Sequence, residues 1–232
     1  MTRWPLAVLF DFDGVIVNSE PLHLQAFQEV LAAEGVALSE EEYFRELIGF
    51  DDRGAFKHIF QKNGRELDPK TFLRVMAHKS RAVMSLIENR NYRALSGVEE
   101  FVRGLWRNYP LAIVSGALRE EIEAMLMGVS LRDCFSVIIA AEDVSVGKPD
   151  PQGYLLAAGQ LSARIGKNIK PSDCLIIEDA PSVAKRVREV GFKVLGLTTS
   201  HPAEKLQDCH WVVNSLRPSE VSTKIPQLKL EV

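Results

Sequence analysis

The stretch Leu6–Val15 constrains the fold of this chain more than any other part of its sequence. Five apolar residues run directly into Asp11, and Asp13 follows two positions later. An apolar run this short predicts a strand that is buried on both faces, as in a parallel sheet. Carboxylates at the end of such a strand cost free energy unless a ligand uses them, and open α/β sheets bind ligands at that end. Asp11 and Asp13 are therefore candidate site residues, although two solvated acids at a strand end would produce the same pattern.

The composition is that of a globular protein, and it narrows the range of partners. A length of 232 residues suits one large domain or a core with a smaller insert. The net charge of -3 provides no electrostatic basis for binding nucleic acid or an anionic membrane. The sequence shows no apolar stretch of membrane-spanning length and no signal-peptide pattern after Met1. We therefore expect a cytoplasmic monomer with no nucleic-acid or membrane partner.

Residues 18–92 carry a helical pattern throughout. Apolar residues at helical spacing, a capping box and first-turn prolines predict four helices. They are Ser19–Ala33, a second helix that begins at Ser39, Asp52–Lys62 and a fourth that begins at Asp68. A helical block between a first strand and later strands predicts a separate small domain. We assign residues 18–92 to this domain, and residues 1–17 and 93–232 to the core.

After Gly97 the pattern changes to an alternation of strands and helices. The predicted strands are Leu111–Val114, Phe135–Ala141, Cys174–Ile177, Val194–Leu197 and Trp211–Val213. The predicted helices are Val98–Arg107, Leu118–Met127, Pro151–Leu161 and Pro181–Val190. This alternation predicts an α/β fold whose core is a Rossmann-like, doubly wound parallel sheet with a four-helix insert. The tail after about Arg217 is polar, and we expect it to pack loosely.

Further polar residues follow the later apolar runs. Ser115 and Gly116 come directly after a predicted strand, where a hydroxyl and free backbone N–H groups at a helix start make a phosphate cradle. Lys148 lies in a stiff Gly-Lys-Pro-Asp-Pro turn, and Glu178 and Asp179 end another buried run. Each has an ordinary explanation when taken singly: a capping serine, a solvated lysine and a solvated strand end.

Taken together, these residues predict a site for phosphoryl transfer. Three buried runs end in polar residues, at Asp11, Ser115 and Glu178, and a parallel sheet brings such ends to one edge. Four carboxylates gathered there repel one another unless a cation lies among them. Oxygen ligands without a Cys or His partner favour Mg²⁺ over zinc. A magnesium ion, a lysine and a helix-start cradle are suited to phosphoryl transfer.

The motifs also resemble those of a known family. Residues 11–15, Asp-Phe-Asp-Gly-Val, resemble the first motif of the haloacid dehalogenase superfamily, specifically its phosphohydrolases. Ser115 is similar to the second motif, Lys148 to the third, and Glu178 with Asp179 to the fourth, in the same order and with similar spacing. The helical insert resembles the cap domain of the subfamily that includes beta-phosphoglucomutase and phosphoglycolate phosphatase.

The resemblance implies a mechanism and a set of metal ligands. Asp11 would attack phosphorus and form an aspartyl-phosphate, and Asp13 would act as general acid and then as general base. Ser115, Gly116 and Lys148 would hold the phosphoryl oxygens. The Mg²⁺ ligands would be the two acids of the fourth motif, Asp11 and the backbone carbonyl of Asp13.

Substrate choice is expected to lie in the helical insert, because a phosphate site alone cannot distinguish sugars. The polar candidates are Glu20, His23, Arg53 and Lys79. In the mutase-like members a His and a Lys occur at positions that correspond to His23 and Lys79. The run Gly49–Arg53 departs from the mutase, which carries an Arg closer to the glycine, whereas acids intervene in this chain.

We therefore expect a Mg²⁺-dependent phosphatase of a small phosphorylated metabolite, such as a sugar phosphate or phosphoglycolate. The alternative with the same core is an isomerase of the beta-phosphoglucomutase type, whose phosphoenzyme must outlive reorientation of the sugar. A haloacid dehalogenase has no need for Asp13 or a metal cluster. A non-catalytic binding protein would be expected to lack one of the motif acids, and all four are present.

Overall fold

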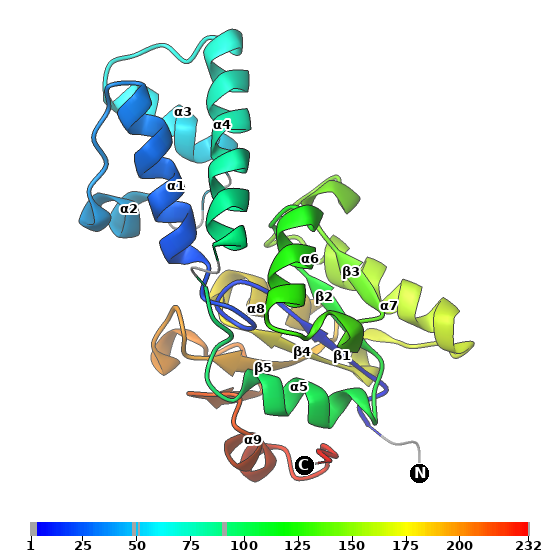
Figure 1. The fold of residues 1–232 in the computed structure, drawn as a ribbon. Coiled ribbons are helices and arrows are strands. Elements are labelled where there is room, and N and C mark those ends of the chain that lie inside the picture. Colours follow the sequence, from blue (N-terminus) through cyan, green and yellow to red (C-terminus); the bar gives the residue numbers. More distant parts are fainter. Residues whose placement is uncertain (1–3, 48–49, 51, 90–91, 232) are drawn as a thin grey trace. The chain divides into compact units, whose positions relative to one another are not determined.

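The structure is a computed structural model that describes residues 4–47, 50, 52–89 and 92–231. The chain divides into two compact units (Figure 1). The first, the α/β unit, comprises Met1–Asn18 and Arg93–Val232, and the second, the helical unit, comprises Ser19–Tyr92. Each unit has a hydrophobic core of its own.

In the described part of the α/β unit, six parallel strands form one sheet with the order β3-β2-β1-β4-β5-β6 (Figure 1). The strands are β1 Ala7–Phe10, β2 Leu111–Val114, β3 Val137–Ile139, β4 Cys174–Glu178, β5 Lys193–Leu197 and β6 Trp211–Val213. Val8 of β1 lies opposite Leu111 of β2 on one side and Leu175 of β4 on the other. The chain thus winds outward from β1 to β3 and then returns to β4. This order is that of a doubly wound, Rossmann-like sheet, which confirms the predicted fold class.

Helices cover both faces of this sheet. They are α5 Val98–Trp106, α6 Arg119–Gly128, α7 Gln152–Ile165, α8 Pro181–Glu189 and α9 Pro218–Lys224. Leu9 of β1 belongs to one hydrophobic cluster with Tyr154 of α7 and Ala184 of α8. On the opposite face, the rings of Phe10 and Phe101 of α5 meet edge to face, with centroids 6.2 Å apart. Because both faces are covered, β1 is apolar at every position.

Short 3-10 turns complete the unit, at Arg132–Cys134, Ala141–Asp143, Pro171–Asp173 and Ala203–Lys205. The first two flank β3, and for this reason β3 is shorter than the predicted strand Phe135–Ala141.

The carboxyl-terminal tail packs closely, so the expectation of loose packing after Arg217 was wrong. Val221 of α9 and the following Ile225 and Leu228 are buried. The N–H of Lys229 donates a hydrogen bond to the Tyr109 hydroxyl at 3.0 Å. These apolar residues recur every three or four positions within an otherwise polar segment, so the composition alone hides them.

The helical unit consists, in its described residues, of four helices. They are α1 Glu20–Ala33, α2 Glu40–Glu46, α3 Asp52–Lys62 and α4 Pro69–Glu88. Ser39 caps α2 by accepting the N–H of Glu42 at 3.1 Å, and Asp68 caps α4 through its side chain, as the capping patterns predict. The core of the unit includes Phe27 and Phe56, whose ring centroids lie 5.0 Å apart.

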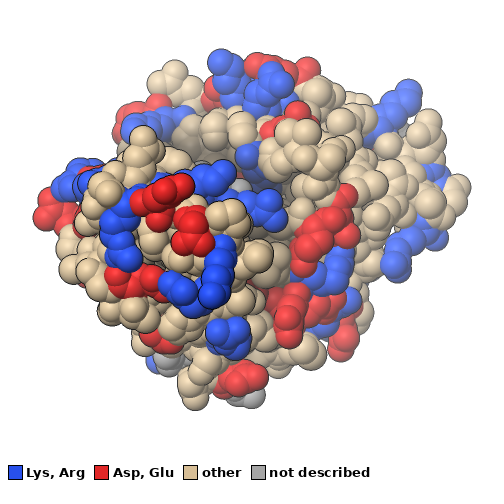
Figure 2. All heavy atoms as spheres, turned by 90° about the horizontal axis from the view of Figure 1, so that it is seen from above, with Lys and Arg blue, Asp and Glu red and all other residues tan. Residues whose placement is uncertain are grey.

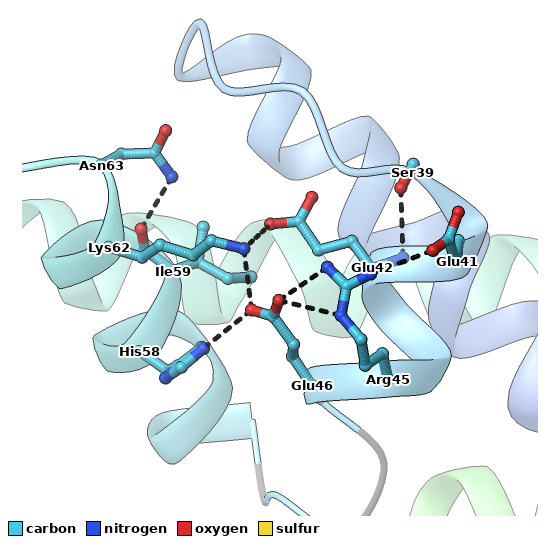
Figure 3. Close-up of polar contacts among 9 residues, drawn as sticks. All are labelled: Ser39, Glu41, Glu42, Arg45, Glu46, His58, Ile59, Lys62 and Asn63. Atoms are coloured by element: carbon cyan, nitrogen blue, oxygen red, sulfur yellow. Dashed lines mark hydrogen bonds and ion pairs between the residues drawn. The ribbon is translucent and has the colours of Figure 1, made fainter.

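Charged side chains on the surface of the helical unit link α2 to α3 (Figure 3). The Glu46 carboxylate pairs with Arg45 of its own helix at 2.8 Å, and with Lys62 at 2.8 Å and His58 at 3.2 Å from α3. Lys62 also pairs with Glu42. The hydrogen bond from Lys62, followed by those from Arg45 and His58, lowers the pKa of Glu46 to about 2. Because solvent screens these charges, the network orients two short helices rather than supplying much stability.

The surface carries charges of both signs. On the face drawn in Figure 2, basic and acidic side chains lie beside one another instead of gathering by sign. Among the helices that the structure describes, none has the length and apolar character required to cross a membrane.

Candidate active site

Three neighbouring strands deliver polar residues to one edge of the sheet. Asp11 follows β1, Ser115 follows β2, and Glu178 is the last residue of β4. The N–H of Asp11 donates to the carbonyl of Ile177 at 2.9 Å, so the chain is still paired with β4 where the carboxylate begins. The strand order reverses at β1 and β4, which is where doubly wound sheets bind their ligands.

Lys148 lies at the centre of this edge. Its Nζ is 2.6 Å from Asp11 Oδ1 and 2.9 Å from Glu178 Oε1, and it lies 5.1 Å from the centroid of the Tyr154 ring. The turn that carries Lys148 immediately precedes α7, and Asp150 in that turn accepts the N–H of Gln152 at 2.9 Å. The lysine predicted from the turn motif therefore joins the acids of two different strands.

Asp13 and Ser115 form a second contact at the same edge. Ser115 Oγ donates to Asp13 Oδ2 at 3.3 Å and accepts the N–H of Ala117 at 2.9 Å. The backbone turns after Phe12, whose carbonyl accepts the N–H of Ile16 at 2.8 Å, and this turn directs Asp13 toward β2.

Two glycines, Gly14 and Gly116, lie beside these contacts and differ in their surroundings. Gly14 has φ +75°, and a Cβ added there would overlap Asp179 Oδ2 and lie 2.9 Å from Asp179 Cγ. Backbone conformation and the nearby carboxylate therefore both require glycine at this position. Gly116 is exposed, and a Cβ added there would meet no described atom within 4 Å. It borders the side of Ser115 that we predicted to receive a phosphoryl group.

At the site one lysine, Lys148, lies among four carboxylates, those of Asp11, Asp13, Glu178 and Asp179. Burial raises the pKa of Asp11 well above its usual value; the Lys148 ammonium opposes this, and the neighbouring carboxylates add to it. Burial, followed by the charge of Glu178, raises the pKa of Asp179 to about 7. Burial alone would lower the pKa of Lys148, but Asp11 and Glu178 outweigh it and raise that pKa. A further cation would relieve this excess of negative charge.

Asp11, Glu178 and Asp179, which we call the carboxylate cluster, fit a divalent metal ion. Each offers one carboxylate oxygen, and these oxygens all lie within 4.8 Å of one another. The cluster consists of hard oxygen donors, a set that favours Mg²⁺ over zinc. Three of the four residues predicted to hold a metal ion, all but Asp13, thus lie together, and the identity of the ion stays a prediction.

Two residues that contact the carboxylate cluster were missed by the sequence analysis. The Tyr154 hydroxyl donates to Glu178 Oε1 at 3.1 Å, and Ser200 Oγ donates to Asp179 Oδ2. Ser200 follows β5, the neighbour of β4, so a hydroxyl just beyond that strand was an available signal. Tyr154 fits the apolar pattern of α7, and nothing in the sequence reveals what its hydroxyl contacts.

The residues predicted to select the substrate belong to the helical unit, where two of them meet. Lys79 of α4 is 1% exposed; its Nζ lies 3.1 Å from His23 Nδ1 of α1 and pairs with Asp52 of α3. An ammonium group has only donors, so Nδ1 is the acceptor and the ring proton is assigned to Nε2. Burial, followed by the charge of Lys79, lowers the pKa of His23 to about 3. We call His23, Asp52 and Lys79 the helical-unit cluster.

The other two predicted residues lie outside this cluster. Glu20 accepts a hydrogen bond from the Tyr43 hydroxyl at 2.6 Å, and Arg53 is exposed. Of the run in which the chain departs from the mutase, Gly49 and Asp51 lie outside the described residues.

Comparison with known proteins identifies the family of this chain. The sequence profile of the haloacid dehalogenase-like hydrolases matches residues 8–197. The chain belongs to this family. The match includes the elements that carry the carboxylate cluster and Lys148, and it confirms the resemblance that the motifs indicated.

Known members of the family are similar to this chain in sequence and in structure. It is 29% identical over 210 residues to validoxylamine A 7'-phosphate phosphatase of Streptomyces hygroscopicus subsp. limoneus, covering 90% of this chain and 92% of that protein. It is 29% identical over 190 residues to a fructose-1-phosphate phosphatase of Escherichia coli (strain K12), covering 80% and 92%. A beta-phosphoglucomutase of Clostridium difficile has a TM-score of 0.78 at 21% identity, covering 96% of both chains, and shows the shared fold. The expected enzyme class, a phosphoric monoester hydrolase of this family, agrees with the two phosphatases.

Proposed function

We propose that the protein is a Mg²⁺-dependent phosphatase that hydrolyses a small sugar phosphate through an aspartyl-phosphate. The observation that carries this proposal is the position of Lys148, whose ammonium lies between Asp11 and Glu178 beside the carboxylate cluster. One cation and several hard oxygen donors at the end of β1 form a place for a phosphoryl group and a metal ion. The two phosphatases named above, one acting on fructose 1-phosphate and one on validoxylamine A 7'-phosphate, support a phosphorylated carbohydrate as substrate.

In the first step Asp11 acts as the nucleophile. Among the described residues, the hydrogen bond from the Phe12 N–H at 2.6 Å and the ion pair with Lys148 both go to Asp11 Oδ1. These contacts orient the carboxylate, so that one of its oxygens forms a bond to phosphorus as the bond to the leaving oxygen breaks. Lys148 and the N–H groups around Ser115 and Gly116 hold the phosphoryl oxygens.

Asp13 moves the protons. It protonates the leaving oxygen in the first step, and in the second it accepts a proton from the water that attacks the aspartyl-phosphate. The second step releases inorganic phosphate and restores the Asp11 carboxylate. The hydrogen bond from Ser115 Oγ, 3.3 Å from Asp13 Oδ2, keeps Asp13 at the edge where the leaving oxygen is expected.

The carboxylate cluster and the backbone carbonyl of Asp13 would hold the metal ion. A bound Mg²⁺ supplies positive charge that offsets the charge of the phosphoryl oxygens. The donor set and the raised pKa values of Asp11 and Asp179 support this assignment.

Residues of the helical unit are proposed to select the leaving group, namely Glu20, His23, Arg53 and Lys79. In the helical-unit cluster the charge of Lys79 is matched by Asp52, and His23 is neutral. A cluster without net charge suits the hydroxyl groups of a sugar, and its one cation is already paired with Asp52. This balance favours hydrolysis of a monophosphate over the mutase alternative, which must also hold a bisphosphate. A monomeric state and a cytoplasmic location stay predictions.

The proposal is tested by following two products at once. The enzyme is incubated with beta-glucose 1-phosphate, Mg²⁺ and a trace of the bisphosphate, and then with other sugar monophosphates. We expect stoichiometric release of inorganic phosphate that outpaces any glucose 6-phosphate, and loss of release when a chelator is added. The Asp11→Asn variant, purified in the same way, reports any contaminating phosphatase. Accumulation of glucose 6-phosphate well ahead of free phosphate would establish the isomerase instead.

A further inference from the structure

Tyr154 of α7 lies beneath the proposed site without facing solvent. It is 0% exposed, and its ring packs edge to face against Phe192, with centroids 6.3 Å apart. Its hydroxyl donates to Glu178 Oε1 at 3.1 Å, and the face of its ring lies 5.1 Å from Lys148 Nζ. One side chain thus contacts both a predicted metal ligand and the predicted phosphate-binding lysine.

Glu178 depends on a small set of donors for its orientation. The residue is 0% exposed, so each carboxylate oxygen needs a partner within the protein. Oε1 accepts from Lys148 at 2.9 Å and from Tyr154 at 3.1 Å, while Oε2 accepts the N–H of Ala180 at 2.8 Å. Of the two donors to Oε1, only Tyr154 is packed in the hydrophobic core, and it has no second role in the chemistry.

Lys148 has competing partners once a substrate binds. It is shared between Asp11 and Glu178, and in the proposed reaction its ammonium turns toward the phosphoryl oxygens. Glu178 then loses part of the interaction that orients it, at the moment when its carboxylate has to hold a metal ion. A hydrogen bond from a rigid neutral donor would keep the carboxylate in place.

We propose that Tyr154 is a positioning residue. Its hydroxyl orients the Glu178 carboxylate for the metal ion, and its ring holds the Lys148 ammonium through a cation–π contact. The assignment rests on the proposed function and adds a residue to it. A tyrosine hydroxyl keeps its proton at neutral pH, so Tyr154 remains a donor to Glu178. Cation–π contact with the ring supports Lys148 without competing for its three N–H donors.

Two substitutions separate the two roles. Tyr154→Phe removes the hydroxyl and keeps the ring, whereas Tyr154→Leu removes both. The matched control is Tyr109→Phe, which deletes another buried hydroxyl of the same unit, one that accepts the N–H of Lys229 at 3.0 Å. Mg²⁺ affinity is measured by calorimetry on the protein without substrate, and KM and kcat are measured with a sugar phosphate at saturating Mg²⁺. Thermal unfolding in a chelator confirms that each variant folds.

We expect Tyr154→Phe to weaken Mg²⁺ binding by roughly tenfold, the lower end of the effect of losing a partner of a metal ligand, with KM at saturating Mg²⁺ unchanged. Tyr154→Leu is expected to weaken Mg²⁺ binding to the same degree and also to raise KM, because Lys148 loses its cation–π contact with the ring. Tyr109→Phe should bind Mg²⁺ as the wild type does.

Mg²⁺ binding by Tyr154→Phe within about twofold of the wild type would overturn the assignment, as would an equal loss in Tyr109→Phe. A wild type that binds Mg²⁺ but hydrolyses no sugar phosphate, with affinity still lost in Tyr154→Phe, would remove the proposed function and leave the role at Glu178 standing. A wild type that hydrolyses sugar phosphates while Tyr154→Phe binds Mg²⁺ normally would remove the role of Tyr154 at Glu178 and leave the proposed function standing.

Discussion

The carboxylate cluster is buried and the helical-unit cluster is partly buried, and each contains polar groups that contact a lysine, yet their charges differ. At the sheet edge, Lys148 contacts two carboxylates, and further acids lie beside them. In the helical unit, Lys79 meets one carboxylate, that of Asp52, and a neutral His23. The first arrangement is left with excess negative charge, whereas the second is balanced by its own members.

The pKa values express this difference. Burial and neighbouring acids raise the pKa of Asp11 and bring that of Asp179 to about 7, so their charged forms are costly until a cation arrives. Burial and Lys79 lower the pKa of His23 to about 3, so its neutral form fits the surroundings as they are. An unbalanced buried cluster is a candidate ligand site, whereas a balanced one needs no further charge.

The largest expected effect comes from removing a charge at the unbalanced cluster. Asp11→Asn should lower turnover by roughly 10³-fold or more, because the nucleophile is lost. The midpoint of thermal unfolding in a chelator should stay the same or rise, since one acid leaves a crowded group. Asp133→Asn, at an exposed acid of the same unit, is the control and should change neither quantity. Turnover at the wild-type rate in Asp11→Asn would exclude Asp11 as the nucleophile.

Removing a charge from the balanced cluster should have the opposite effect on stability. Lys79→Met should lower the free energy of unfolding by roughly 2 kcal/mol, because His23 loses its buried donor, while the partly exposed Asp52 carboxylate remains solvated. Turnover of a sugar phosphate should fall far more than that of a small aryl phosphate. Lys57→Met, at an exposed lysine of α3, is the matched control for denaturant unfolding and both assays. Equal losses on the two substrates would show that Lys79 does not select the leaving group.

The smallest expected effect is a dependence of stability on pH that comes from His23. Its pKa is about 3 in the folded protein and about 6.5 when unfolded, so below pH 6.5 the unfolded chain binds more protons. Stability is therefore full above pH 6.5 and falls with decreasing pH, by at most about 2 kcal/mol at pH 5.

Denaturant unfolding at pH 7 and pH 5 checks this dependence in His23→Gln, which should lose less stability between the two values than the wild type. The control is His78→Gln, at a partly exposed histidine that pairs with Glu29 on the surface of the same unit. If wild type and His23→Gln lose the same amount, burial of a neutral His23 does not govern the acid side of the stability curve.

The sequence by itself determined the parts of the structure that depend on neighbouring residues. Apolar runs of strand length that end in Asp11, Ser115 and Glu178 indicated a parallel sheet with its chemistry at one edge. Capping residues such as Ser39 fixed where helices begin, because a cap contacts the backbone N–H groups two or three positions onward. These signals are local in the chain, and each has few physical alternatives once the strands pair.

Only the tertiary structure decided which distant side chains meet. Tyr154 contacts Glu178 from 24 positions away and Ser200 contacts Asp179 from 21, and no local pattern links either pair. Asp52 meets Lys79 only because α3 packs beside α4, which pairs this candidate lysine with a carboxylate from another helix. The tail after Arg217 has a polar composition, and only the packing of α9 beside β6 shows that it belongs to the fold. Such contacts depend on how elements pack across the fold, and the energy that selects them comes from burial rather than from the sequence nearby.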